Sequence, residues 1–190
     1  VDIQYDAERM EPYLQRLHRK IDSAKRSADF VFVCPHMGGQ HNEYPGAYSE
    51  YIMGRLCGFG ADAIVGTHPH IIQRMQITDE IPQAFCLGSY SITPNNIYVP
   101  KGSLPEYGIM LHFYLDEGKI HKVSFSVIKS TEDKELSVWP TEVLIKKLKG
   151  AKAERLQEEV ALACKRFWPK MDVESIRKGE LEYEYQVFAL

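Results

Sequence analysis

Hydrophobic residues recur at helical spacing near the start of the chain. Leu14, Leu17 and Ile21 stand three or four residues apart with Arg and Lys between them, which predicts an amphipathic helix lying on a core. The apolar run at 30–34 follows, and a short continuous run of this kind is typical of a strand buried on both faces of a parallel sheet. The first predicted unit is therefore a helix followed by a strand.

The same order of elements is predicted once more. Tyr48, Ile52 and Leu56 mark a second amphipathic helix, glycines follow it, and residues 61–65 form a second buried apolar run. Helices that alternate with buried strands predict an α/β layered fold. In such folds, ligands collect in the loops at the carboxyl ends of the strands.

The second half of the chain changes in character. Two antiparallel strands, 108–115 and 119–128, are predicted after a shorter one at 83–87. Beyond residue 130 the sequence becomes charged, with apolar residues at helical spacing. We therefore expect residues 1–130 to form one α/β domain and residues 131–190 to form a helical extension packed on it.

Composition narrows the class of protein. With 190 residues, 44% of them hydrophobic and 26% charged, the chain is long enough for one buried core. Its net charge of -3 provides no general basic field for nucleic acid or a membrane surface. No apolar run reaches the roughly 18 residues of a transmembrane helix, and no signal peptide is visible, so the cellular location stays open. Because the chain begins with Val1 instead of Met, we expect an upstream segment.

The four cysteines are widely spaced, and three of them lie within or beside apolar runs. A cysteine in such a run usually behaves as a small core residue. We expect buried thiols and no disulfide framework at Cys34, Cys57, Cys86 and Cys164.

The candidate chemistry lies in two histidine-bearing loops, each directly after a predicted buried strand. His68 and His70 flank Pro69 after the turn residue Gly66, and Pro69 favours extended backbone at His68, from which alternate side chains project to one side. His36 follows the first strand. Neutral imidazole is a common ligand of Zn, Mn and Fe, so these three histidines are candidate metal ligands. The alternative is that they are polar loop residues capping strand ends.

Other polar residues flank these loops. His41, Glu43 and Tyr44 extend the first loop, either as part of the site or as solvent-facing residues. Arg74 and Lys101 could attract carboxylates, although each is also typical of an ordinary solvated charge.

Four short motifs follow one another in a recognisable order and spacing. They are His36-Met37-Gly38 with Pro45, Gly60-Ala61-Asp62, Gly66-Thr67-His68-Pro69-His70-Ile71 with Gln73, and Cys86-Leu87-Gly88-Ser89. Over about residues 28–90 the chain resembles the bacterial capsule-synthesis proteins of the CapA or poly-gamma-glutamate type. These belong to the calcineurin-like metallophosphoesterase superfamily. In the family pattern an aromatic residue stands at the position of Met37, and Asn stands at the position of Ser89.

The resemblance implies a fold and a metal centre. The fold would be a layered αββα metallophosphoesterase-like sandwich, of which residues 1–130 are the C-terminal half, with extra C-terminal helices. His36, His68 and His70 would help to hold one or two divalent metals, Mn, Fe or Zn, and His36 or His68 could instead protonate the leaving group. Nothing in this chain matches the family's Gly-Asp motif, Asn-Glu motif and further His. A missing N-terminal segment or a partner chain would therefore complete the site.

The resemblance also implies a function, with two alternatives. A metal-dependent hydrolase or transferase would act on poly-gamma-glutamate or a related anionic polymer of the cell envelope. A metallophosphoesterase acting on small phosphate esters would use the same histidines. A scaffold subunit that keeps the fold without catalysis is the third hypothesis, and metal analysis separates it from the other two.

Overall fold

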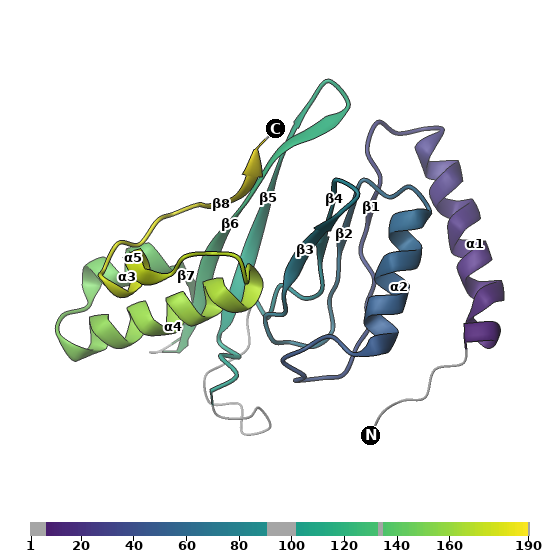
Figure 1. The fold of residues 1–190 in the computed structure, drawn as a ribbon. Coiled ribbons are helices and arrows are strands. Elements are labelled where there is room, and N and C mark those ends of the chain that lie inside the picture. The colour runs from purple at the N-terminus through teal and green to yellow at the C-terminus, as the bar shows by residue number, and fades with distance from the viewer. Residues whose placement is uncertain (1–6, 91–101, 133–134, 190) are drawn as a thin grey trace.

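The computed structural model describes residues 7–90, 102–132 and 135–189, which form helices and two sheets (Figure 1). The helices are α1 (Ala7–Lys25), α2 (Ala47–Gly58), α3 (Thr141–Lys147), α4 (Ala151–Phe167) and α5 (Glu174–Arg177). The strands are β1 (Phe32–Val33), β2 (Ala63–Val65), β3 (Met75–Thr78), β4 (Ile81–Ala84), β5 (Tyr107–Asp116), β6 (Lys119–Glu132), β7 (Leu136–Pro140) and β8 (Tyr185–Ala189). The α/β class that the hydrophobic pattern predicts is confirmed.

The first sheet has the strand order β1-β2-β4-β3 and is covered on one face by α1 and α2 (Figure 1). β1, β2 and β4 are parallel, and β3 joins β4 as an antiparallel hairpin. The periodic residues Leu14 and Ile21 of α1 are buried with Leu56 of α2 and Ile64 of β2. The sheet is thus assembled from the two predicted helix and strand units.

Asp62, from the second of the four motifs, joins these units. Its Oδ2 accepts the amide hydrogen of Val31 over 2.6 Å, and its Oδ1 pairs with Lys25 Nζ over 2.7 Å. Asp62 therefore fixes the entry to β1 against the end of α1.

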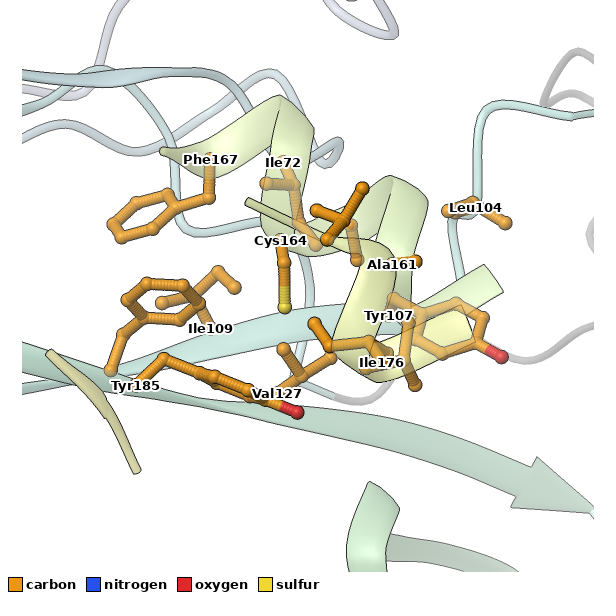
Figure 2. Close-up of a cluster of buried hydrophobic side chains, with 14 of the residues drawn as sticks. Ile72, Leu104, Tyr107, Ile109, Val127, Ala161, Cys164, Phe167, Ile176 and Tyr185 are labelled. Atoms are coloured by element: carbon orange, nitrogen blue, oxygen red, sulfur yellow. The ribbon is translucent and has the colours of Figure 1, made fainter. Parts of the chain in front are cut away.

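The second sheet is built on the long hairpin of β5 and β6, and both β7 and β8 pair with the other edge of β6. Alternate residues of β5 and β6 share one core with α4 and with part of the first sheet. Figure 2 shows this core, in which Phe167 and Cys164 of α4 lie near Ile109 and Val127 of the hairpin. This core therefore holds the two sheets and α4 together, and a second cluster packs α1 and α2 on the first sheet.

Several local expectations need correction. β1 is shorter than the predicted strand and Phe32 is 38% exposed, so this strand is not buried on both faces. Cys34 is exposed, whereas the other three cysteines are buried as predicted. β1 lies at the edge of its sheet, which explains both exposures.

The residues after 130 supply two strands, β7 and β8, as well as helices, so this part of the chain is not purely helical. The boundary at residue 130 stays a prediction. Within the described parts of the chain, no helix is long and apolar enough to span a membrane.

Candidate histidine site

The two histidine loops lie side by side because the strands that lead into them are parallel neighbours. The pairing of β1 with β2 continues beyond the strands as a bridge between His36 and Thr67. The amide of Thr67 donates to Pro35 O over 2.9 Å, and the amide of Met37 donates to Thr67 O over 3.1 Å. The loops therefore meet at the carboxyl edge of the sheet, where α/β folds place their sites.

Two glycines permit close packing around the second histidine loop. A Cβ atom at Gly66 would stand 2.2 Å from the carbonyl oxygen of Phe85, so only glycine fits between the strands there. Gly38 has a φ of 105°, and a Cβ there would lie 3.3 Å from both Pro69 and Ser49. Only glycine adopts a positive φ with little penalty, so the first loop needs glycine at this position to pack against Pro69 of the second loop.

The backbone at the histidines is not extended as predicted. His68 has a φ of 106° and His70 a φ of 60°, and His41 in the first loop has a φ of 61°. The second loop turns here, and Pro69 O accepts the amide hydrogen of His41 over 2.8 Å. Positive φ outside glycine costs of order 1–3 kcal/mol per residue and tends to cluster at functional sites.

A chain of hydrogen bonds orients His36 and His68. The Thr67 hydroxyl donates to Pro35 O over 3.4 Å, which leaves its oxygen to accept from His36 Nδ1 over 3.2 Å. His36 Nε2 then carries a lone pair, and His68 Nδ1 lies 2.9 Å from it. In this arrangement His68 Nδ1 donates to His36, and His68 Nε2 keeps its own lone pair.

His70 is oriented in the same way by Ser89. The Ser89 hydroxyl donates to the backbone oxygen of His70 over 3.2 Å, and its oxygen lies 3.3 Å from His70 Nδ1. His70 Nδ1 can therefore donate to Ser89, which leaves His70 Nε2 as an acceptor. Ser89 is buried, and its hydroxyl makes a polar contact with the site.

His41 joins the cluster, which the sequence left undecided. Its ring centroid lies 6.1 Å from that of His70, and its Nδ1 is buried without a hydrogen-bond partner among the described residues. Burial lowers the pKa of His70, and the three neighbouring histidines lower it further. His70 therefore favours the neutral form, which is the form that binds metals.

Contacts from more distant parts of the chain hold the first loop in place. Gln73 Nε2 donates to Asn42 O over 2.8 Å. Glu43 Oε1 accepts from Arg166 Nη2 and from the Ser103 hydroxyl, both over 3.3 Å. Glu43 is thus turned toward α4 instead of the histidines, and α4 is tied to the loop that carries His36 and His41.

The donor set fits a metal only in part. The rings of His68 and His70 lie 6.3 Å apart between centroids, and those of His36 and His68 lie 4.6 Å apart. In the described ranges, no group of three or more His, Cys, Asp or Glu side chains is arranged to hold a metal ion. The assignment of His36, His68 and His70 as ligands therefore stays a prediction, supported by the orientation of their ring nitrogens.

The remaining candidates contribute less. Tyr44 is 79% exposed. Arg74 pairs with Glu50 over 3.1 Å and lies over the ring of Phe85, so its charge is directed toward α2. Lys101 lies outside the described residues.

The fold and the histidine loops define the class of protein. It is an α/β protein with a polar site, rich in imidazole, at the carboxyl ends of parallel strands. Residues 2–92, just under half of the chain, match the family described as Bacterial capsule synthesis protein PGA_cap, and this match supports the family resemblance that the motifs predict.

Two curated relatives agree with this family. Capsule biosynthesis protein CapA of Bacillus anthracis is 30% identical over 77 residues, which cover 40% of this chain and 19% of that protein. PGA biosynthesis protein CapA of Bacillus subtilis is 30% identical over 70 residues, which cover 37% of this chain and 18% of that protein. The matched region thus spans less than a fifth of either relative.

Proposed function

We propose that the histidine loops form one side of a divalent-metal centre in a hydrolase or transferase that acts on poly-gamma-glutamate or a related anionic capsule polymer. The family match and the names of the two relatives, which refer to capsule and PGA biosynthesis, support this biological setting. The chemical part of the proposal depends on the histidine geometry.

The observation that carries the proposal is the matched orientation of His36 and His70. Each directs Nδ1 to a hydroxyl whose own proton goes to a backbone carbonyl, so the lone pair of each ring lies on Nε2. In His36 this lone pair faces His68 Nδ1 at 2.9 Å. A fixed hydrogen bond on the far ring nitrogen is the usual support of a metal-binding histidine. A bound Mn, Fe or Zn ion would acidify water and stabilise negative charge at the scissile group.

His68 would have a second task beside metal binding. Its Nδ1 faces His36 Nε2 at 2.9 Å, so His68 can accept a proton at Nε2 while its Nδ1–H keeps donating to His36 Nε2. The pair can then deliver one proton to a leaving group. A cation at His36 Nε2 would compete with His68 for the same lone pair, so metal loading and the orientation of His68 should be coupled.

The carboxylate ligands would come from outside the described residues, where an upstream segment or a partner chain would supply them. A site with neutral imidazoles alone gives a divalent cation no compensating negative charge, and carboxylates would provide it. The histidine loops would then supply the imidazole ligands of the metal centre, and the upstream segment or partner chain would supply its carboxylate ligands.

Metal analysis of the full-length protein tests the proposal. We expect stoichiometric Mn, Fe or Zn in the wild type and substantially less in His68→Ala and in His70→Ala. His121→Ala is the matched control, because His121 is exposed on the second sheet and should leave occupancy unchanged. Absence of stoichiometric metal in the wild type, or wild-type occupancy in both site variants, would refute the assignment.

The hydroxyl contacts provide a finer test. Thr67→Val and Ser89→Ala should keep the fold but weaken metal binding about 10- to 100-fold, since each removes the group that orients a ligand. Unchanged affinity in both variants would contradict the proposed role of the hydroxyls.

Substrate class is tested separately by following cleavage or transfer of poly-gamma-glutamate and hydrolysis of an aryl phosphate. We expect turnover of the polymer that His70→Ala removes. Turnover of the aryl phosphate alone would favour the small-ester phosphoesterase, and metal-free protein without either activity would favour a scaffold.

A further inference from the structure

A second candidate site lies in the C-terminal half, outside the residues that match the family. A cleft of about 360 Å³ is lined by residues of β6, β7, α3 and α4, which lie together in Figure 1. This volume falls within the range of about 300–1,000 Å³ that is usual for small-molecule sites.

The cleft carries a positive excess. Its lining contains four cations and two carboxylates, which are Lys129, Lys147, Lys152, Arg155, Glu106 and Glu159. The formal excess is two positive charges, although the whole chain has a net charge of -3. The cleft therefore differs in sign from the protein that surrounds it.

The two carboxylates are already engaged by cations of the same wall. Glu159 accepts from the Tyr107 hydroxyl over 2.5 Å, from Lys129 Nζ over 3.0 Å and from Arg155 Nε over 2.8 Å. Lys129 also pairs with Glu106 over 3.5 Å. These contacts neutralise Lys129 and Arg155 within the wall, so the positive excess is carried by other residues at the mouth.

Lys147 and Lys152 carry that excess beside an apolar surface. Lys147 Nζ lies 3.7 Å from the centroid of the Trp139 ring, where a cation is attracted by the ring face. Lys152 lies in the first turn of α4, whose positive dipole end adds to the local field. Leucines complete the apolar part of the lining, at Leu144, Leu148 and Leu156.

We propose that this cleft binds a small organic anion that has an apolar or aromatic body and one carboxylate or phosphate group. The body packs against the leucines beside Trp139, whose ring already contacts Lys147 Nζ, and the charged group lies near Lys147 and Lys152. This site is separate from the histidine loops and does not depend on the function proposed for them.

Calorimetric titration of the full-length protein with two probes of the same body tests the site. Phenyl phosphate and phenylacetate should each bind saturably. The probe that binds with the higher affinity shows whether the cleft prefers a phosphate or a carboxylate group. Benzylamine has the same ring with the opposite charge and should not bind. Lack of saturable binding for both anions, or equal binding of benzylamine, would overturn the proposal.

Matched variants locate the binding. Lys147→Gln and Lys152→Gln should each weaken the preferred probe about fivefold, as expected for one partly screened charge. Lys149→Gln removes an exposed charge from the same stretch without touching the cleft, and it should bind the probe as the wild type does. Loss of affinity that is equal in all three variants would show a general charge effect and refute the site.

His68→Ala separates this proposal from the metal centre. It should leave the affinity for the preferred probe unchanged whether or not it lowers metal content. A fall in probe affinity in His68→Ala that matches the fall in Lys152→Gln would place the anion at the histidines and overturn the assignment.

Discussion

Replacing Gly66 with Ala should destabilise the protein and displace the histidine turn. An added Cβ would stand 2.2 Å from Phe85 O, 3.0 Å from Phe85 C and 3.2 Å from Ala84 O. All three atoms belong to the backbone of the segment beside the turn, so no side-chain rotation can relieve the overlap. The two segments would have to separate.

The expected magnitude follows from two costs. Overpacking of a well-filled region costs about 1–3 kcal/mol. Separation would also break the hydrogen bond from Gly66 N to Ala84 O, now 2.7 Å long, and an unpaired buried amide costs about 1–3 kcal/mol. Together they predict a loss of about 2–6 kcal/mol, a large part of the roughly 5–15 kcal/mol by which a typical domain is stable.

Urea unfolding followed by circular dichroism measures this loss, and Gly54→Ala is the control. Gly54 is exposed inside α2 and has nothing within 4 Å of its added Cβ, so the same substitution should raise stability by up to about 1 kcal/mol. Equal stability of Gly66→Ala and the wild type would refute the reasoning. A fall in the stability of both variants would show that the contact with Phe85 is not the cause.

Three further predictions concern thiols, acid stability and the first histidine loop. Iodoacetamide should label Cys34 alone in the native protein and all four cysteines after denaturation, because the other three are buried. Mass spectrometry counts the labels, and a second label on the native protein would contradict this prediction. Burial raises the pKa of Glu159, but its hydrogen bonds to Tyr107, Arg155 and Lys129 lower the pKa by more than burial raises it, so the pKa in the folded protein lies below 4.5. The ionised Glu159 carboxylate therefore stabilises the folded protein above pH 4.5, and this contribution is lost as the pH falls through the lower folded pKa. Glu159→Gln should then lose less stability than the wild type on acidification. An identical loss in both proteins would contradict this prediction. Arg166→Ala should speed amide hydrogen exchange in residues 39–43 while Arg177→Ala does not, because Arg166 holds Glu43; equal exchange in both would exclude the tether.

Much of the site could be predicted from the sequence because it depends on chain order. Buried apolar runs followed by Pro, Gly and His place His36 and His68 at the same edge of a parallel sheet, and the structure brings them to hydrogen-bond distance. His41 was undecided, since no local rule distinguishes it from a solvent-facing residue. Its place depends on the hydrogen bond from its backbone amide to Pro69 O, in a residue 28 positions away in the chain. The number of histidines in the first loop was the available signal.

Other features could not be predicted because they depend on contacts between distant residues. The extended geometry expected at His68 follows a local bias of residues before proline, and the turn that meets the first loop overrides it. The pairing of β7 and β8 with β6 overrides the charged, helical character of the C-terminal sequence. Likewise, Cys34 belongs to an apolar run but lies exposed, because the end of an edge strand has no neighbour to cover it.

The sequence by itself determined the α/β class, the pair of histidine loops and the resemblance to the capsule-synthesis family, because periodicity and motif spacing are local properties of the chain. Tertiary structure alone decided which ring nitrogens carry the lone pair, through the Thr67 and Ser89 hydroxyls, and which loop residues face the site. It also assembled the cationic cleft from four separate elements. The physical reason is that the direction of a hydrogen bond and the shape of a cleft depend on groups brought together only by the packing of the core.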